Sequence, residues 1–182
     1  MVARRMGDSV SSRELFLQEK PAGILLAMRE SEGSAYIAKL AEATRCTYAH
    51  AFRVIEKLEM LGLVSSSEQG RVRMIKLTDL GKAVADELFK LSSLMALVEA
   101  SNAIDRLYDA EIRGKLREEI DKEKFLGKAE ELAAALEEIL KKAPTEFHGL
   151  VKKEMKRLEE LKLEVKGIVV GSPSDGGMSA QR

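Results

Sequence analysis

Cysteine and histidine are both scarce in this chain. Cys46 is the single cysteine among 182 residues, so no internal disulfide can form. One cysteine and two isolated histidines provide no ligand set for a zinc site. We therefore expect no metal and no other cofactor.

Long apolar runs are also missing. No stretch approaches the roughly 20 apolar residues that a membrane span needs. After Arg4 and Arg5, the segment from Asp8 to Ser12 stands where a secretory signal would need its apolar core. We expect a cytoplasmic protein.

Tryptophan is absent and asparagine occurs once, at Asn102, whereas lysine and glutamate are plentiful. Such a composition is typical of hyperthermophile proteins. Lys- and Glu-rich helices that dominate an ordinary chain produce the same bias, so both interpretations stay open.

The net charge is zero, with 30 basic and 30 acidic residues and a pI near 6.8. This balance argues against a protein that coats nucleic acid without sequence preference, because such proteins are strongly basic. It is compatible with a domain that has one basic face.

Catalytic patterns are lacking too. The sequence has no glycine loop of the phosphate-binding type, no cluster of metal ligands and no nucleophile beside a base. Paired carboxylates occur only within charged helical stretches. We therefore expect a protein that is not an enzyme.

Helical periodicity begins after an N-terminal tail over residues 1–14, where Ser11 and Glu14 have the spacing of a capping box. Pro21 suits the start of a helix that continues with Ile24, Leu25 and Met28. A short extended link is expected at 34–36.

Two further helices follow that link. The first contains Ile37, Leu40 and Ala41, and residues 44–46 end it. Thr47 is a good N-cap for the second. One side of this second helix is apolar at the spacing of 3.6 residues per turn, through Ala51, Val54, Ile55, Leu58 and Leu61.

The period then changes to that of a β-hairpin. Gly62 stands where a left-handed C-cap belongs, residues 63–64 begin an extended piece, residues 65–70 are turn-like and residues 71–77 partly alternate. Thr78-Asp79 predicts the cap of a new helix, which continues through Met95.

From Ser101 to about Val165 the chain is predicted to be helical, apart from a break at Pro144. One apolar seam has the spacing 4-3-4-3-4 of a coiled coil, at Phe125, Ala129, Leu132, Leu136, Ile139 and Ala143. We expect this seam to be buried against the same chain or a partner, with a symmetric dimer as the preferred solution. Apolar positions up to Ile168 mark a last helix.

The order of these elements predicts a mainly α fold with a small β-hairpin wing. It is a winged helix-turn-helix domain followed by a C-terminal helical, coiled-coil-like region. We expect this domain over residues 15–101, a helical dimerisation region over 102–170 and a flexible tail over 171–182.

Residues 38–44, 47–61, 62–64, 70–71 and 77–81 resemble the MarR and ArsR type of prokaryotic transcriptional regulators, especially archaeal members. The resemblance covers about 80 residues. It implies sequence-specific binding of double-stranded DNA by a homodimer, with the second helix of the motif in the major groove and the wing beside it. It also allows a small-molecule effector, but no residue names one.

The residues of that second helix agree with such a role. Ala49, Phe52, Arg53 and Glu56 lie opposite its apolar side, and Lys57 lies at the edge. Arginine can pair with guanine, and Ala49 or Phe52 can touch a thymine methyl group. The residues predicted to bind DNA are Thr47, Tyr48, Ala49, His50, Phe52, Arg53, Lys57, Arg71 and Arg73. From residue 36 to 82, eight basic residues stand against five acids, a local excess of +3.

Alternatives remain for several of these residues. Phe52 and Glu56 also suit a protein-interaction adaptor built on a winged-helix scaffold, since an exposed Phe is a common interface anchor. A third interpretation is an architectural protein that bridges DNA. Tyr48 fits a phosphate contact or a packing role, and His50 fits a surface polar position. Cys46 fits a small filler, or a redox sensor near a helix N-terminus.

Overall fold

The computed structural model describes residues 19–69 and 72–167. Several predictions lie outside this part of the chain: the capping box at Ser11, the tails over 1–14 and 171–182, and the apolar position Ile168. Among the described residues, no helix is both long enough and apolar enough to cross a membrane.

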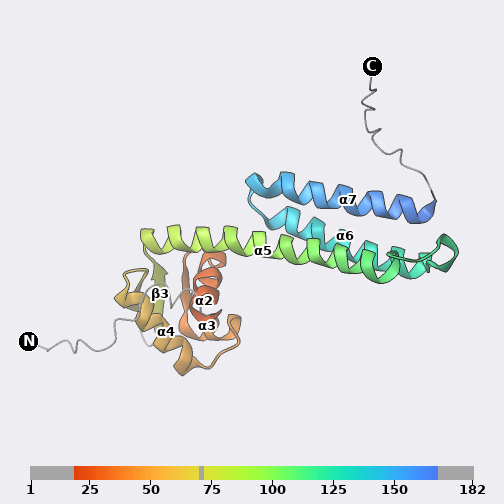
Figure 1. The fold of residues 1–182 in the computed structure, drawn as a ribbon. Coiled ribbons are helices and arrows are strands. Elements are labelled where there is room, and N and C mark those ends of the chain that lie inside the picture. Colours follow the sequence, from red (N-terminus) through yellow and green to blue (C-terminus); the bar gives the residue numbers. More distant parts are fainter. Residues whose placement is uncertain (1–18, 70–71, 168–182) are drawn as a thin grey trace, which may run out of the picture. The chain divides into compact units, whose positions relative to one another are not determined.

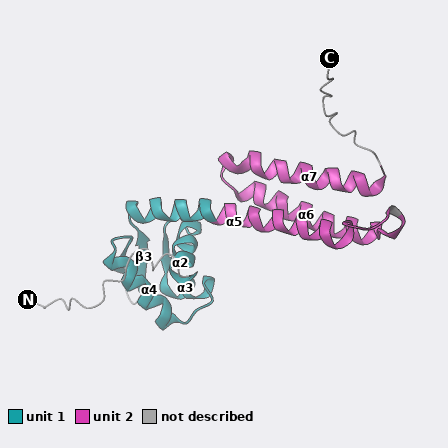
Figure 2. Ribbon diagram, viewed as in Figure 1, with its two compact units in different colours: residues 1–91 teal, residues 92–182 magenta. Residues whose placement is uncertain are grey.

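The chain divides into two compact units, residues 1–91 and residues 92–182 (Figure 2). Helix α5 (Asp79–Glu111) contributes residues to both. The predicted domain boundary between residues 101 and 102 falls inside this helix. Ser101 does not interrupt it, and its hydroxyl lies 3.2 Å from Oε2 of Glu154.

Unit 1 has the predicted winged helix-turn-helix fold (Figure 1). Before α5, its elements in chain order are α2 (Glu19–Glu30), β1 (Ser34–Tyr36), α3 (Ile37–Ala43), α4 (Tyr48–Met60), β2 (Val64–Gln69) and β3 (Val72–Leu77). The strands form an antiparallel sheet in the order β1-β3-β2. Helices α3 and α4 make the helix-turn-helix, and the β2–β3 hairpin makes the wing.

The core of unit 1 collects the residues that helical spacing marks as apolar. Ile24, Leu25 and Met28 of α2, Leu58 of α4 and Ile75 of β3 have no exposed surface. Full burial of a side chain of this size contributes about 1.5–3 kcal/mol. This cluster therefore holds the helix-turn-helix against the sheet.

The wing strand β2 is longer than predicted. The turn expected over residues 65–70 is wrong for the first five of them, which belong to β2. Ser65 pairs with Lys76 and Ser67 pairs with Met74. The backbone supplies these ladder bonds, so polar side chains can continue a strand where they face solvent.

The junction between the hairpin and α5 depends on Thr78 and Gly81. The Thr78 hydroxyl accepts a hydrogen bond from the Gly81 N–H at 3.0 Å, which confirms the predicted helix cap. It also donates to the Gly62 carbonyl at 2.7 Å. A Cβ atom at Gly81 would lie 1.9 Å from the Leu63 carbonyl oxygen, so only glycine fits this close approach.

Unit 2 consists of the second part of α5 and two further long helices, α6 (Lys122–Lys142) and α7 (His148–Lys166). The continuous helix predicted from Ser101 is wrong between residues 112 and 121. There the chain leaves α5 through Gly114, whose φ of 75° lies in the left-handed region, and then forms a short 3-10 turn.

The predicted seam on α6 is buried within its own chain. Phe125, Ala129 and Leu136 have no exposed surface, and they share one apolar cluster with Ile104 of α5 and Leu158 of α7. The three helices therefore cover the seam between them. Burial against the same chain, one of the two expected solutions, is confirmed, and the preference for a second copy as the cover of this stripe is wrong. A homodimer stays a prediction.

Glu111 is the one buried charged residue among those described, and it closes the corner between α5 and α6. Its side chain is 4% exposed. Its Oε1 atom lies 2.8 Å from Nζ of Lys128 and 3.0 Å from Nζ of Lys124, and Lys115 approaches Oε2 at 3.7 Å. The hydrogen bond from Lys128, followed by that from Lys124, lowers the pKa of Glu111 to about 2.

This lowered pKa predicts an acid-sensitive unit 2. The ionised carboxylate stabilises the fold fully above its ordinary pKa of 4.5, and this stabilisation is lost as the pH falls toward about 2. Glu111→Gln is expected to lower the Tm at neutral pH, and the difference from wild type should shrink through that window. Thermal melts followed by circular dichroism at several pH values measure it.

Glu130→Gln is the matched control for this test. Glu130 is an exposed residue of α6, and no ion pair joins it to another described residue. Its variant should follow the wild-type curve at every pH. A Tm difference for Glu111→Gln that stays constant from neutral pH to below pH about 2 would refute the role given to the carboxylate.

Candidate nucleic-acid interface

The turn between α3 and α4 is held by backbone hydrogen bonds. The Arg45 N–H donates to the Glu42 carbonyl and the Cys46 N–H donates to the Ala41 carbonyl, both at 3.0 Å. Arg45 itself has a φ of 49° in the left-handed region. These bonds satisfy carbonyl groups at the end of α3, so the turn gives α4 a defined starting direction.

Side chains reinforce the same turn. The Thr44 hydroxyl donates to the Leu40 carbonyl at 2.7 Å, and Lys20 of α2 donates to the Thr44 carbonyl at 3.0 Å. Cys46 is half-buried, and its Sγ atom lies 3.2 Å from the Thr44 hydroxyl. This position fits the packing interpretation of Cys46; the redox interpretation stays a prediction.

The first turn of α4 is open to solvent. The Thr47 hydroxyl accepts a hydrogen bond from the His50 N–H at 3.2 Å, which confirms the predicted N-cap. Tyr48, Ala49 and His50 are all exposed, Tyr48 at 56%. The positive end of the helix dipole therefore lies among side chains that an anionic ligand can reach.

One face of α4 points outward along its whole length. Ala49, Arg53, Glu56 and Met60 are exposed and follow each other at spacings of four, three and four residues. No hydrogen bond or ion pair joins Arg53 to another described residue. The predicted site residues Ala49 and Arg53 thus lie together on this face, with Arg53 as a free cation.

Further cations of unit 1 lie on α4 itself, on α3, in the turn before α4 and on β3. Lys57 is half-buried at the edge of the face, where the sequence predicts it. Lys39 of α3, Arg45 in the turn and Lys76 of β3 are exposed, and none has a hydrogen-bonded or paired side chain among the described residues. Helical periodicity did not place Lys39, Arg45 or Lys76 in the predicted site. The excess of positive charge over residues 36–82 was the sequence feature that pointed to them.

Phe52 does not share the outward face. It is half-buried and packs against the core of unit 1, so the exposed position expected for it is wrong. The helical angle explains the difference: Phe52 lies about 100° around the helix from buried Ala51. It is therefore on the flank that meets Arg73 of the wing, and Arg53 lies on the far side. A contact between Phe52 and a thymine stays a prediction.

Arg73, another predicted site residue, is paired within unit 1. Its Nη2 atom lies 2.6 Å from Oε2 of Glu59, and its guanidinium lies 5.4 Å from the centroid of the Phe52 ring. Glu59 was not among the predicted site residues, although its spacing of seven from Phe52 places both side chains on one flank of α4. The predicted site residue Arg71 lies outside the described residues.

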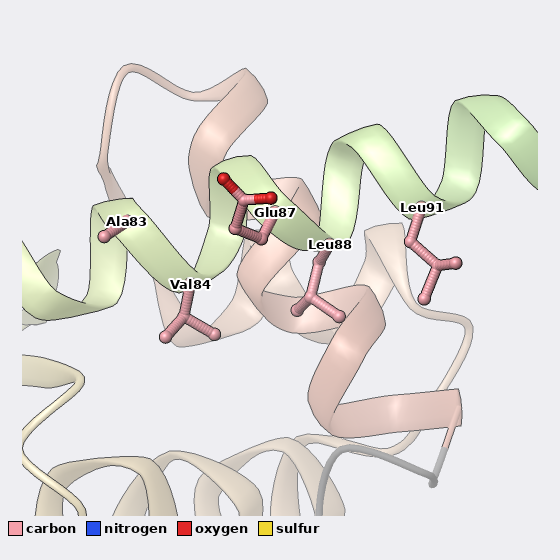
Figure 3. Close-up of a pocket in the computed structure, with 5 residues that line it drawn as sticks. All are labelled: Ala83, Val84, Glu87, Leu88 and Leu91. Carbon is pink, nitrogen blue, oxygen red and sulfur yellow. The ribbon is translucent and has the colours of Figure 1, made fainter.

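A second surface of unit 1 is apolar. An open groove of about 360 Å³ is lined by Ala83, Val84, Glu87, Leu88 and Leu91 of α5. Val84, Leu88 and Leu91 point to the same side of the helix (Figure 3). Leu91 is 56% exposed. A groove of this kind is a candidate surface for contact with another protein.

The fold and the outward face of α4 define a winged helix-turn-helix protein. No family model and no curated protein matches the chain. Among solved structures, the chain is similar to AF1382 from Archaeoglobus fulgidus, with 24% identity and a TM-score of 0.41, over 47% of this chain and 97% of that one.

The chain is also similar to the MarR family transcriptional regulator SPO1453 from Silicibacter pomeroyi DSS-3. This alignment has 27% identity and a TM-score of 0.38, and it covers 50% of this chain and 62% of that one.

Proposed function

We propose that this protein is a transcriptional regulator that binds double-stranded DNA through unit 1, with α4 in the major groove and the β2–β3 wing beside it. The observation that carries this proposal is the outward face of α4. Thr47 caps the start of this helix, and the face is exposed along its length. Arg53 lies at its centre and has no partner among the described residues. In helix-turn-helix proteins the second helix inserts such a face into the groove.

The side chains on this face suit the reading of base edges. Arg53 can donate two hydrogen bonds to O6 and N7 of guanine, and Ala49 can touch a thymine methyl group. Glu56 can accept a hydrogen bond from N4 of cytosine. The acid on the outward face is then a source of sequence preference.

The surrounding groups suit the phosphate backbone. Lys39, Arg45, Lys57 and Lys76 are positions from which cations can contact phosphates. Thr47, Tyr48 and His50 lie at the exposed helix start, where hydroxyl, ring and backbone groups commonly position DNA. Arg71 at the wing remains part of this proposal as a contact to the minor groove.

Salt dependence tests the proposal directly. Four phosphate contacts release about 0.9 counterion each, so the binding constant should fall on the order of 100-fold for an approximately fourfold rise in salt. Fluorescence anisotropy with labelled duplexes measures it. Lys152→Ala should leave the slope unchanged, because Lys152 is an exposed residue of α7 that forms no ion pair with another described residue. Wild-type binding that is flat with salt would rule out the DNA interface.

We also propose that the protein acts as a homodimer, so that two copies of α4 read two half-sites. The seam on α6 is buried within its own chain, so it does not favour a dimer. The apolar groove on α5 does favour one. Leu91 is half-exposed there, so burial of its apolar surface by a second copy would be favourable. We expect the full chain to be dimeric and Leu91→Lys to be monomeric, because a charge would enter the apolar contact.

Sedimentation equilibrium measures both states. Leu116→Lys is the matched control, since Leu116 is 68% exposed but belongs to unit 2 and lies outside the groove. It should remain dimeric. A wild-type monomer would contradict the dimer, and a Leu91→Lys variant that stays dimeric would move the interface elsewhere.

The same groove supports a second candidate function, a protein-interaction adaptor. In that case α5 holds an apolar segment of another protein, and the acid Glu56 on α4 has no DNA role. The two functions differ in one measurement. An adaptor shows no DNA binding at low salt, whereas the regulator does.

A further inference from the structure

Arg73 joins the wing to the recognition helix at two points. It belongs to β3, and its Nη2 atom lies 2.6 Å from Oε2 of Glu59. Its guanidinium carbon lies 5.4 Å from the centroid of the Phe52 ring. Phe52 and Glu59 are seven residues apart, which puts them two turns apart on one flank of α4. The side chains of Arg73 and Glu59 are only 31% and 23% exposed.

These contacts distinguish Arg73 of the wing from Arg53 of the recognition helix. Arg53 has no partner among the described residues, so its charge is available to DNA. The charge of Arg73 is balanced by a carboxylate, and its planar group lies near an aromatic ring that is itself packed against the core. A phosphate would have to compete with the Glu59 carboxylate for the charge of Arg73.

We propose that Arg73 is a positioning residue that fixes the wing relative to α4 and makes no phosphate contact. This inference rests on the proposed DNA binding and refines it. With the hairpin held at Glu59 and Phe52, the wing and α4 meet the two grooves of a duplex in one geometry. The Arg73–Glu59 ion pair then increases the preference of the protein for its specific site over random DNA. It contributes nothing to the release of counterions from phosphates.

Three full-length variants test this role: Arg73→Ala, Glu59→Gln and the charge reversal Glu59→Arg with Arg73→Glu. Binding to the preferred duplex, found by selection from random DNA, is compared with binding to random duplex over a range of salt. Each single variant should bind the preferred site up to about five-fold more weakly, the range of a partly exposed ion pair. Binding to random DNA and the salt slope should stay the same.

The charge reversal decides between the two roles. It restores an ion pair but places an acid on the wing, so affinity should recover relative to the single variants if Arg73 only positions. A phosphate contact predicts the opposite pattern. Arg73→Ala would then lower the slope by about 0.9 and weaken all sequences alike, while Glu59→Gln would bind as well as wild type or better. That pattern would overturn the inference.

Hydrogen exchange without DNA separates this inference from the proposed function. Arg73→Ala and Glu59→Gln should both speed amide exchange in β3, because the hairpin loses its tie to α4. Lys76→Ala, on the same strand and exposed, should not. Wild-type protein that fails to bind DNA would remove the proposed function. Unchanged exchange in both variants would remove the positioning role, whatever the DNA result.

Discussion

Replacing Phe125 by alanine is expected to destabilise unit 2 by about 3–5 kcal/mol, the range for a large aromatic side chain in a packed core. Phe125 has no exposed surface and lies in the cluster shared by α5, α6 and α7. Its removal leaves a cavity that three long helices cannot easily close. Urea denaturation followed by circular dichroism measures the loss.

The same measurement tests where the α6 seam is buried. If the seam packs within one chain, the loss in Phe125→Ala is the same at all protein concentrations. Leu116→Ala serves as the control, since Leu116 is 68% exposed and its variant should stay within about 0.5 kcal/mol of wild type. A destabilisation by Phe125→Ala that grows on dilution would show that the seam lies between copies.

Replacing Arg53 by alanine is expected to cost about 1–3 kcal/mol in binding to the preferred DNA site, or roughly 5- to 150-fold in affinity. The side chain is exposed and unpaired among the described residues, so the fold should be unaffected. Specificity should relax at the base pair that Arg53 reads. Selection of bound sequences before and after the substitution identifies that position.

Two further variants serve as controls for Arg53→Ala. Arg53→Lys keeps the charge but loses the planar pair of donors, so it should recover the nonspecific part of the affinity and little of the specificity. Arg106→Ala removes an exposed arginine from α5 in unit 2, for which no ion pair to a described residue exists, and should change neither. Equal binding of Arg53→Ala and wild type to every duplex would mean that α4 presents another face to DNA.

The sequence alone predicted the winged helix-turn-helix because its signals are local. Thr47 and Thr78 cap helices by bonds to backbone groups three residues away, and Gly62 adopts a φ of 71° that other residues avoid. The apolar positions of α4 repeat at the helical period, so its buried side was evident without any partner. Arg53 and Ala49 followed as the opposite side.

Some elements were misjudged because their stability is not local. The serines of β2 carry no strand signal, and they are held by backbone pairing with β3, a contact that the sequence does not display. Residues 112–121 are a different case, because Gly114 was a local signal of the same kind as Gly62 and was overlooked among helix-forming side chains. The contacts of Glu111 with Lys124 and Lys128 of α6 were not evident from the sequence.

The sequence by itself determined which faces of α4 and α6 are apolar and which cations stand near the recognition helix. Only the tertiary structure decided what covers those faces and which cations are free. Periodicity states that Phe125 must be buried but not against what, because a helix of the same chain and a helix of a second copy satisfy the hydrophobic effect equally. In the same way, the sequence predicts both Arg53 and Arg73 as cations that bind DNA and does not distinguish their roles. The fold brings Glu59 and Phe52 to one of them and leaves the other facing solvent.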